Sequence, residues 1–217
     1  TSLTSFLATG LNSGTNFSSA WGGCSVLATF PVLDLSSGTN FSETWRSCTG
    51  MVSFGACNMN AGASFINAWR NNTALATFPA GVFDDWAPAS VTTDCFLDAW
   101  HNCPALTEQS VENILLSISA SGQWATSTGT SSGTPLAGKE ITIGTSNSNV
   151  NVDNLSASNR AACTALQSRG WEVVINGSIV SEYALSFNGT DEYVDVGTSS
   201  TLNPADITIS AWIKPTT

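Results

Sequence analysis

The chain has 217 residues, of which 42% are hydrophobic and only 10% are charged, so most of its polarity comes from Ser, Thr, Asn and Gly. That length allows a sizeable buried core and argues against a chain that is disordered throughout. Six basic residues stand against 16 acidic ones, a formal charge of −10, which argues strongly against nucleic-acid binding because Lys and Arg must neutralise the phosphate backbone.

The composition is typical of a β-rich extracellular, cell-surface or virion protein. The sequence contains no apolar run of about 18 residues, the length that a membrane-spanning helix needs. Its first residues carry no basic segment, so the sequence predicts neither a membrane span nor a signal peptide.

A repeat of 24 residues occupies the first half of the chain, with copies starting at Thr15, Thr39 and Ala63. The aligned positions are Phe17, Phe41 and Phe65; Trp21, Trp45 and Trp69; Cys24, Cys48 and Asn72; Leu27, Met51 and Leu75; and Phe30, Phe54 and Phe78. A fourth copy follows an insertion, and the chain is expected to begin inside a repeat. Apolar residues at a fixed period favour stacked units, because one unit cannot bury its own hydrophobic face.

The aromatic, cysteine and leucine positions carry a family resemblance. They read Trp21-Gly-Gly-Cys24-Ser-Val-Leu27 in the first copy, and the pattern returns at Trp45 and Trp100. Residues 1–106 therefore resemble the BspA-like leucine-rich repeats, which implies a solenoid of 24-residue coils. Within each coil, the segment Leu27-Ala28-Thr29-Phe30 is expected to be a β-strand.

The six cysteines form no Cys-x-x-Cys pair, so their spacing does not predict a zinc site. A disulfide framework stays open for an even number of cysteines. Buried thiols are the favoured interpretation, because a chain of this length does not need covalent cross-links.

The repeat stops after residue 106, and the next segment predicts alternating helices and strands. Thr107 can cap a helix whose apolar residues are Val111, Ile114, Leu115 and Ile118, the spacing of one helical face. A strand is predicted at 140–143, a helix at 156–169 that ends before Gly170, and a strand at 171–175. This α/β block, residues 107–178, is expected to cap the solenoid.

The last segment, residues 179–217, contains strand-like runs at 183–187, 193–196 and 207–213. Phe187, Gly189, Tyr193 and Trp212 make it resemble the start of a laminin-G-like, concanavalin-A-like jelly roll, cut off before its later strands. The predicted fold class is thus α+β and β-rich. It comprises a leucine-rich-repeat-like solenoid (1–106), a small α/β cap (107–178) and a partial β jelly roll (179–217).

Two columns of side chains and one aromatic residue are candidate ligand-binding positions. Ser5, Thr29, Ser53 and Thr77 each precede a core Phe and form a hydroxyl column on the predicted sheet face. A second column holds Arg46, Arg70 and His101, which could contact an anion such as sialic acid or could simply be solvated. Trp86 lies in the insertion beside two aspartates and is the aromatic residue expected to be exposed.

The sequence predicts no catalytic constellation, because His101 is the only histidine available to a nucleophile. No cofactor is expected. Asp191, Glu192 and Asp195 could ligate calcium, although three acids in a hairpin are more often plain surface.

The two resemblances imply a non-enzymatic adhesion module of a cell surface or a phage fibre. Its expected partner is a host surface glycan or protein, with neither nucleic acid nor a membrane span involved. The alternative is a structural filament, sheath or capsid-decoration component that packs against copies of itself or against other virion or surface proteins.

Overall fold

The computed structural model describes residues 3–5, 10–90, 94–125, 140–144, 150 and 155–180. The chain divides into a first compact unit, residues 1–182, and a second, residues 183–217. All described residues belong to the first unit. The three strand-like runs predicted after residue 182 therefore lie outside the described residues, as do the candidate calcium ligands Asp191, Glu192 and Asp195.

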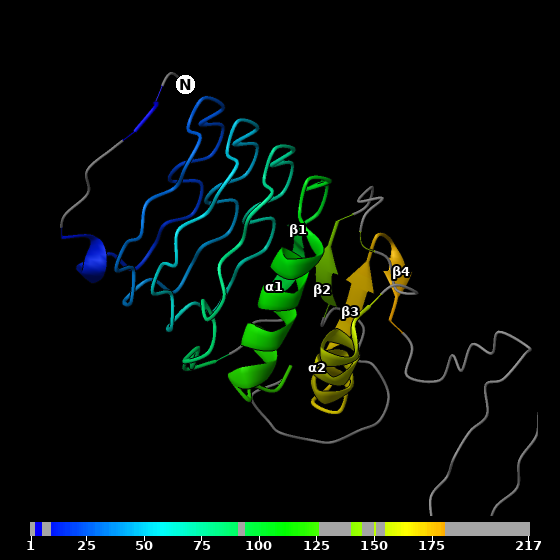
Figure 1. The fold of residues 1–217 in the computed structure, drawn as a ribbon. Helices are drawn as coiled ribbons and strands as arrows, with labels where there is room; N and C mark the ends of the chain where they lie inside the picture. The colour runs from blue at the N-terminus through cyan, green and yellow to red at the C-terminus, as the bar shows by residue number, and fades with distance from the viewer. Residues whose placement is uncertain are drawn as a thin grey trace, which may run out of the picture. The chain divides into compact units, whose positions relative to one another are not determined.

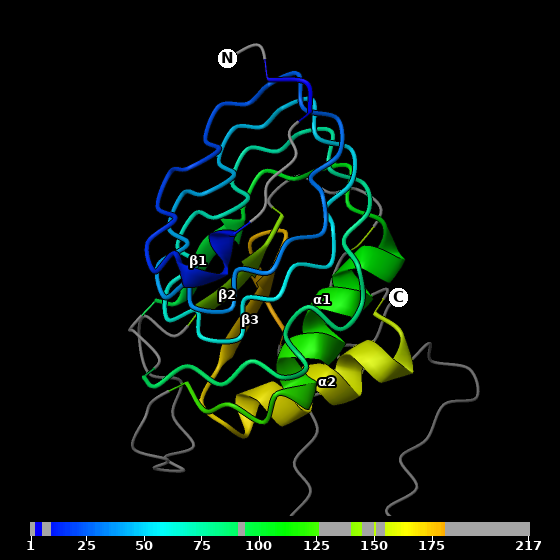
Figure 2. The ribbon, with the colours of Figure 1, turned by 90° about the vertical axis from the view of Figure 1, so that its left-hand side faces the viewer.

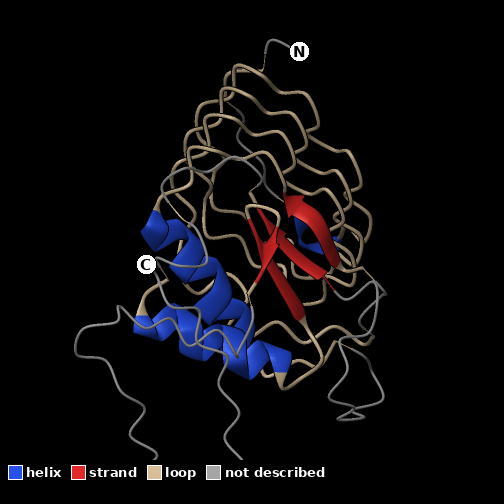
Figure 3. Ribbon diagram, turned by 90° about the vertical axis from the view of Figure 1, so that its right-hand side faces the viewer, coloured by secondary structure: helices blue, strands red, loops and turns tan. Residues whose placement is uncertain are grey.

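The regular elements of the first unit form an α/β fold (Figure 1). In chain order they are a short 3-10 helix η1 (Leu11–Ser13), β1 (Phe96–Trp100), α1 (Glu108–Ala120), β2 (Glu140–Ile143), α2 (Ala157–Gln167), β3 (Glu172–Ile175) and β4 (Ser178–Ile179). The sheet order is β1-β2-β3-β4. The first three strands are parallel, and β4 is antiparallel to β3. Both helices lie on the same side of the strands (Figure 3).

The predicted fold class is wrong. The described elements form an α/β fold with one four-stranded mixed sheet and two helices, and they indicate no β-rich, leucine-rich-repeat solenoid with a separate cap. The segment expected to be a strand shows the reason: Leu27 and Phe30 are buried, whereas Ala28 and Thr29 between them are both exposed. Side chains of a strand alternate between its two faces, so this spacing belongs to a bent loop.

The repeat residues form loops that lie in register with one another. We call them loop 1 (residues 15–38), loop 2 (39–62) and loop 3 (63–86). Equivalent backbone N–H and C=O groups join them, from Phe17 to Asn40 at 2.9 Å, from Phe41 to Ser64 at 2.8 Å and from Phe65 to Cys95 at 2.7 Å. The last of these bonds leads to the start of β1, so loop 3 adjoins the sheet. Viewed from the side of loop 1, the loops follow similar paths (Figure 2).

Columns of aromatic rings fill the core inside the loops. The indole rings of Trp45, Trp69 and Trp100 are fully buried and stack with centroids 5.0 Å apart, while Trp21 stacks on Trp45 at 5.9 Å. Phenylalanine columns run beside them, with Phe54 stacked on its neighbours at 5.3 Å. Three members of the tryptophan column therefore belong to the core, and Trp21 packs against it.

The predicted helices and short strands after the repeat are confirmed within two residues of their bounds. The Thr107 hydroxyl accepts a hydrogen bond from the N–H of Ser110 at the start of α1, and Ser156 plays the same role for α2. Gly170 follows α2 with a φ of 84°, a left-handed conformation that glycine adopts without a steric penalty. The four apolar residues predicted for one face of α1 are all buried.

Two serine hydroxyls attach α1 to loop 3. Ser110 accepts a hydrogen bond from the N–H of Phe78 at 3.0 Å and donates to the Ala76 carbonyl at 2.8 Å. Ser117 accepts from the N–H of Phe83 and donates to Asp84 at 2.8 Å. The helix therefore satisfies backbone groups of loop 3 that it would otherwise bury unpaired.

Candidate recognition surface

The structure brings three of the four predicted column hydroxyls together. Parallel bridges pair Thr29 with Ser53 and Ser53 with Thr77, and the Ser53 hydroxyl donates a hydrogen bond to that of Thr29 at 3.1 Å. Thr29 and Thr77 are exposed and Ser53 is half-buried. Ser5 is also exposed, but it stands outside this bridged row.

The row belongs to a larger surface that sequence reasoning missed. We call it the uncharged face: the exposed side chains of residues 25–32, 49–56 and 73–80, three segments without any Asp, Glu, Lys, Arg or His. A second exposed hydroxyl column runs through Ser25, Thr49 and Thr73. Exposed methyl groups lie beside the hydroxyls, on Val26, Val32 and Val52, whose exposed fractions are 49%, 70% and 48%.

The signal for this surface was present in the repeat. Ser25, Thr49 and Thr73 are 24 residues apart, so aligning the copies at this position as well would have found the second hydroxyl column. The valines could not have been placed in the same way, because apolar residues in a repeat are usually assigned to the core.

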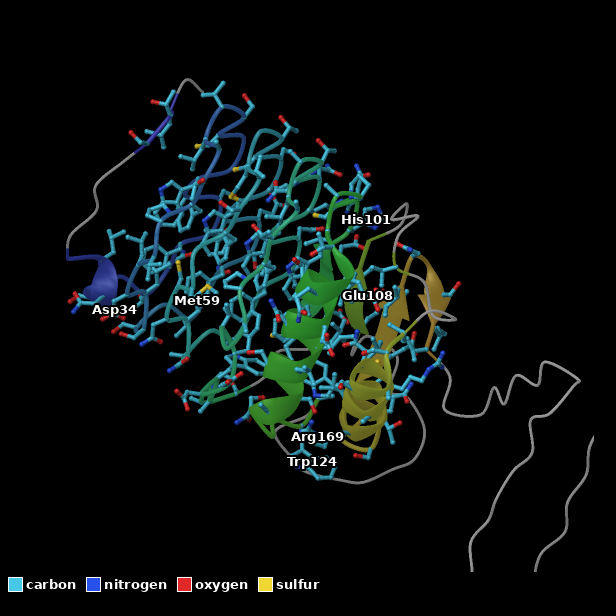
Figure 4. All side chains as sticks on the ribbon, viewed as in Figure 1. Asp34, Met59, His101, Glu108, Trp124 and Arg169 are labelled. Carbon is cyan, nitrogen blue, oxygen red and sulfur yellow. The ribbon has the colours of Figure 1, made fainter. Side chains whose placement is uncertain are left out.

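The column of Arg46, Arg70 and His101 lies outside the uncharged face, and its members contact acidic side chains. His101 is labelled in Figure 4. An ion pair joins Arg46 to Glu43 at 3.1 Å. The Asp98 carboxylate contacts both Arg70, at 2.7 Å, and His101 Nδ1, at 3.2 Å. Glu43 and Asp98 each contact the basic residue three positions later in the chain. Arg70, from loop 3, contacts Asp98 on β1. Acidic side chains therefore compensate the positive charge of this column.

The expectation that Trp86 is exposed is wrong. Only 1% of Trp86 is exposed, and its indole N–H donates to the Gly62 carbonyl at 2.6 Å. Its ring packs against Phe96 and Trp171 with centroids 5.1 and 6.2 Å away. The insertion folds back onto the core because the indole there gains both apolar contacts and a carbonyl acceptor.

All six cysteines are buried thiols. Burial raises the pKa of Cys48 and Cys163 to about 11 and that of Cys57 and Cys103 to about 12. Because the thiolate is the nucleophile and the metal ligand, burial suppresses both kinds of chemistry at these four residues. Among the residues that the structure describes, no three or more His, Cys, Asp or Glu side chains are grouped as a metal ion would require.

No protein-family model matches the chain, and comparisons with curated proteins and with solved structures found no match either. The resemblances drawn from the repeat and from the last segment stay predictions, as do the domain boundaries. Within the described part of the chain, no helix combines the length and the apolar character needed to cross a membrane.

Proposed function

We propose that the chain is a non-enzymatic recognition module of a cell-surface or virion protein. It binds a glycan or protein on a host surface through the uncharged face. The observation that carries this proposal is the in-register row of Thr29, Ser53 and Thr77 beside three exposed valines, in a chain with a formal charge of −10.

The surface has the physical features of a contact region. Exposed apolar groups that gather on one face mark interaction sites more often than those that are scattered singly. The loops that present them are held by backbone bonds between layers and by the buried aromatic columns. A rigid scaffold that positions exposed loop residues is a common arrangement for binding.

A direct test measures binding of the full chain to intact candidate host cells and to a glycan array. Thr77→Arg places a bulky charge at one end of the hydroxyl row on the uncharged face and should abolish saturable binding. Thr164→Arg is the matched control, because Thr164 is exposed on α2, and it should bind like the unmodified chain. Equal binding by both variants would contradict the proposed surface.

One observation favours the alternative of self-assembly. In loop 2 the carbonyls of Asn40 and Ser42 accept bonds from loop 1, whereas the equivalent residues of loop 1, Asn16 and Ser18, are exposed. A layer whose residues are exposed at the end of a stack can pair with a layer of another chain. Size-exclusion light scattering over a concentration series separates the two functions: growth into large assemblies without binding to cells would favour the structural role.

A further inference from the structure

We infer that the ligand of the uncharged face is a neutral glycan and not a sialylated, sulfated or otherwise anionic one. The inference rests on the function proposed above and names the class of partner for the same surface. Charge, hydroxyl chemistry and the absence of anchor residues each contribute to it.

The charge distribution of the chain disfavours an anionic ligand. Anionic sugars are recognised by Arg or Lys, which form short charge-assisted hydrogen bonds. The three segments of the uncharged face hold no such residue. Arg46 and Arg70 lie in the other column and are engaged by Glu43 and Asp98. The chain as a whole is strongly acidic, so an anionic polymer would be repelled as it approached.

The hydroxyl columns match the hydrogen-bonding chemistry of a sugar. A Ser or Thr hydroxyl both donates and accepts hydrogen bonds, and so does each hydroxyl of a sugar. Hydroxyls recur from loop to loop, at a spacing of about 4.8 Å for bridged neighbours, while Val26 and Val52 offer methyl groups to the C–H faces of sugar rings. A polymer of neutral sugars presents the same alternation of hydroxyl and C–H groups.

The uncharged face lacks the large anchor residues that are typical of a protein interface. Protein interfaces draw most of their binding energy from a few Trp, Tyr or Arg anchors. The uncharged face has none: its only aromatic residues, Phe30, Phe54 and Phe78, are buried. Without an exposed ring for stacking, each contact is weak, so strong binding requires several modules that act together.

The experiment uses the full chain, biotinylated and displayed as a tetramer on streptavidin, on an array that holds neutral, sialylated and sulfated glycans. We expect binding to neutral oligosaccharides or polysaccharides alone. Tetravalent display should raise the apparent affinity roughly 100-fold or more over the single chain. Raising the salt from about 0.05 M to about 0.5 M should change the affinity less than about twofold, because screening acts on charges.

Two isosteric variants test the hydroxyls without adding charge. Thr29→Val and Thr77→Val keep the shape of the side chain and remove one hydroxyl each, and each should weaken binding by about fivefold. Thr164→Val on α2 is the matched control and should leave binding unchanged. Circular dichroism confirms that all three variants are folded.

The outcomes distinguish this inference from the proposed function. Salt-sensitive binding to sialylated or sulfated glycans would overturn the neutral class but leave a recognition module. If the chain bound no glycan on the array, and if protease treatment of the cells abolished its binding to them, the partner would be a protein. That result would also overturn the neutral class. An empty array together with no binding to cells would overturn both.

Discussion

At the scale of single residues, the loops depend on backbone conformations that most side chains avoid. Two positions of the repeat have positive φ in every copy. The first position is Ser19, Glu43, Asn67 and Asp98, and the second is Gly23, Ser47, Asn71 and Asn102. Gly, Asn and Asp tolerate this left-handed region better than other residues do. Ser47, with a φ of 60°, therefore carries a conformational cost that Asn71 and Asn102 largely avoid.

Ser47→Asn should stabilise the protein. Asn102 already donates a side-chain hydrogen bond to Asn71 at 3.1 Å, and an asparagine at position 47 would be the next in that column. We expect a gain of roughly 0.5–1 kcal/mol in the free energy of unfolding, which corresponds to a rise in Tm of about 1–4 °C for a chain of this size. Thermal unfolding followed by circular dichroism measures it.

The control for that prediction is Thr73→Asn, because Thr73 is exposed and does not have positive φ. Its Tm should stay unchanged. An equal rise in both variants would show that asparagine acts through something other than the left-handed backbone.

We expect the buried thiols to make the protein less stable at alkaline pH. Thiols of the unfolded chain have a pKa of about 8.5, whereas burial raises the pKa of Cys48 to about 11 and that of Cys103 to about 12. Above that unfolded pKa the unfolded chain loses protons that the folded chain keeps, so the free energy of unfolding falls as pH rises. Below about pH 7.5 these thiols contribute no pH dependence.

Tm measured from about pH 7 to about pH 10.5 tests this. Burial raises the pKa of the Cys57 thiol to about 12. Cys57→Ala removes this thiol and should therefore make the decline of Tm with pH shallower. A slope identical to that of the unmodified chain would mean that other groups cause the decline.

At the scale of elements, α1 is held by its two inward hydroxyls as well as by its apolar face. Ser117→Ala would leave the buried N–H of Phe83 and the Asp84 carboxylate without their bonds to this hydroxyl. We expect a loss of about 1–3 kcal/mol, measured by urea unfolding. Ser168→Ala removes only an exposed hydrogen bond, from the Ser168 hydroxyl to the Ala165 carbonyl at 2.9 Å, and should change stability by less than about 0.5 kcal/mol.

Helices were easier to predict than loops for a physical reason. The cap at Thr107 and the four apolar residues of α1 are local signals, and they place the start of the helix correctly. The segment from Leu27 to Phe30 has apolar ends three positions apart, which a strand cannot bury on one face. Trp86 was misplaced because its partner carbonyl, on Gly62, is distant in sequence.

At the scale of the molecule, protection of backbone amides should differ between loop 1 and loop 3. Loop 3 lies between loop 2 and β1, and Ala68 is fully buried, whereas the equivalent Ala20 of loop 1 is exposed. Regions with less burial open locally at lower free energy.

Hydrogen exchange should therefore be at least about tenfold slower at Phe65, Asn67 and Trp69 than at Phe17 and Ser19. These amides donate to equivalent carbonyls of the next layer, so the comparison needs no variant. Equal rates would indicate that the layers open only together.

The 24-residue register was predictable because the aromatic residues recur at that spacing in the sequence. The same register appears in the backbone hydrogen bonds between the loops. The fold class was not. The four-stranded sheet unites β1, which lies in the fourth copy of the repeat, with β2 and β3 from beyond it. The spacing of Phe96 and Trp100 is the same as in the three copies that form loops. The fourth copy contains a strand because β2, from a later part of the chain, pairs with it.

The stacked indoles also give the molecule an optical property. Trp45, Trp69 and Trp100 lie at equal spacing, with planes tilted by only 11° and 3° from one neighbour to the next. At such separations the electronic transitions of adjacent indoles couple, so light absorbed by one ring is shared along the column. Rings held in one fixed arrangement give a near-ultraviolet circular dichroism signal, so this signal of the folded chain should be lost when the column separates.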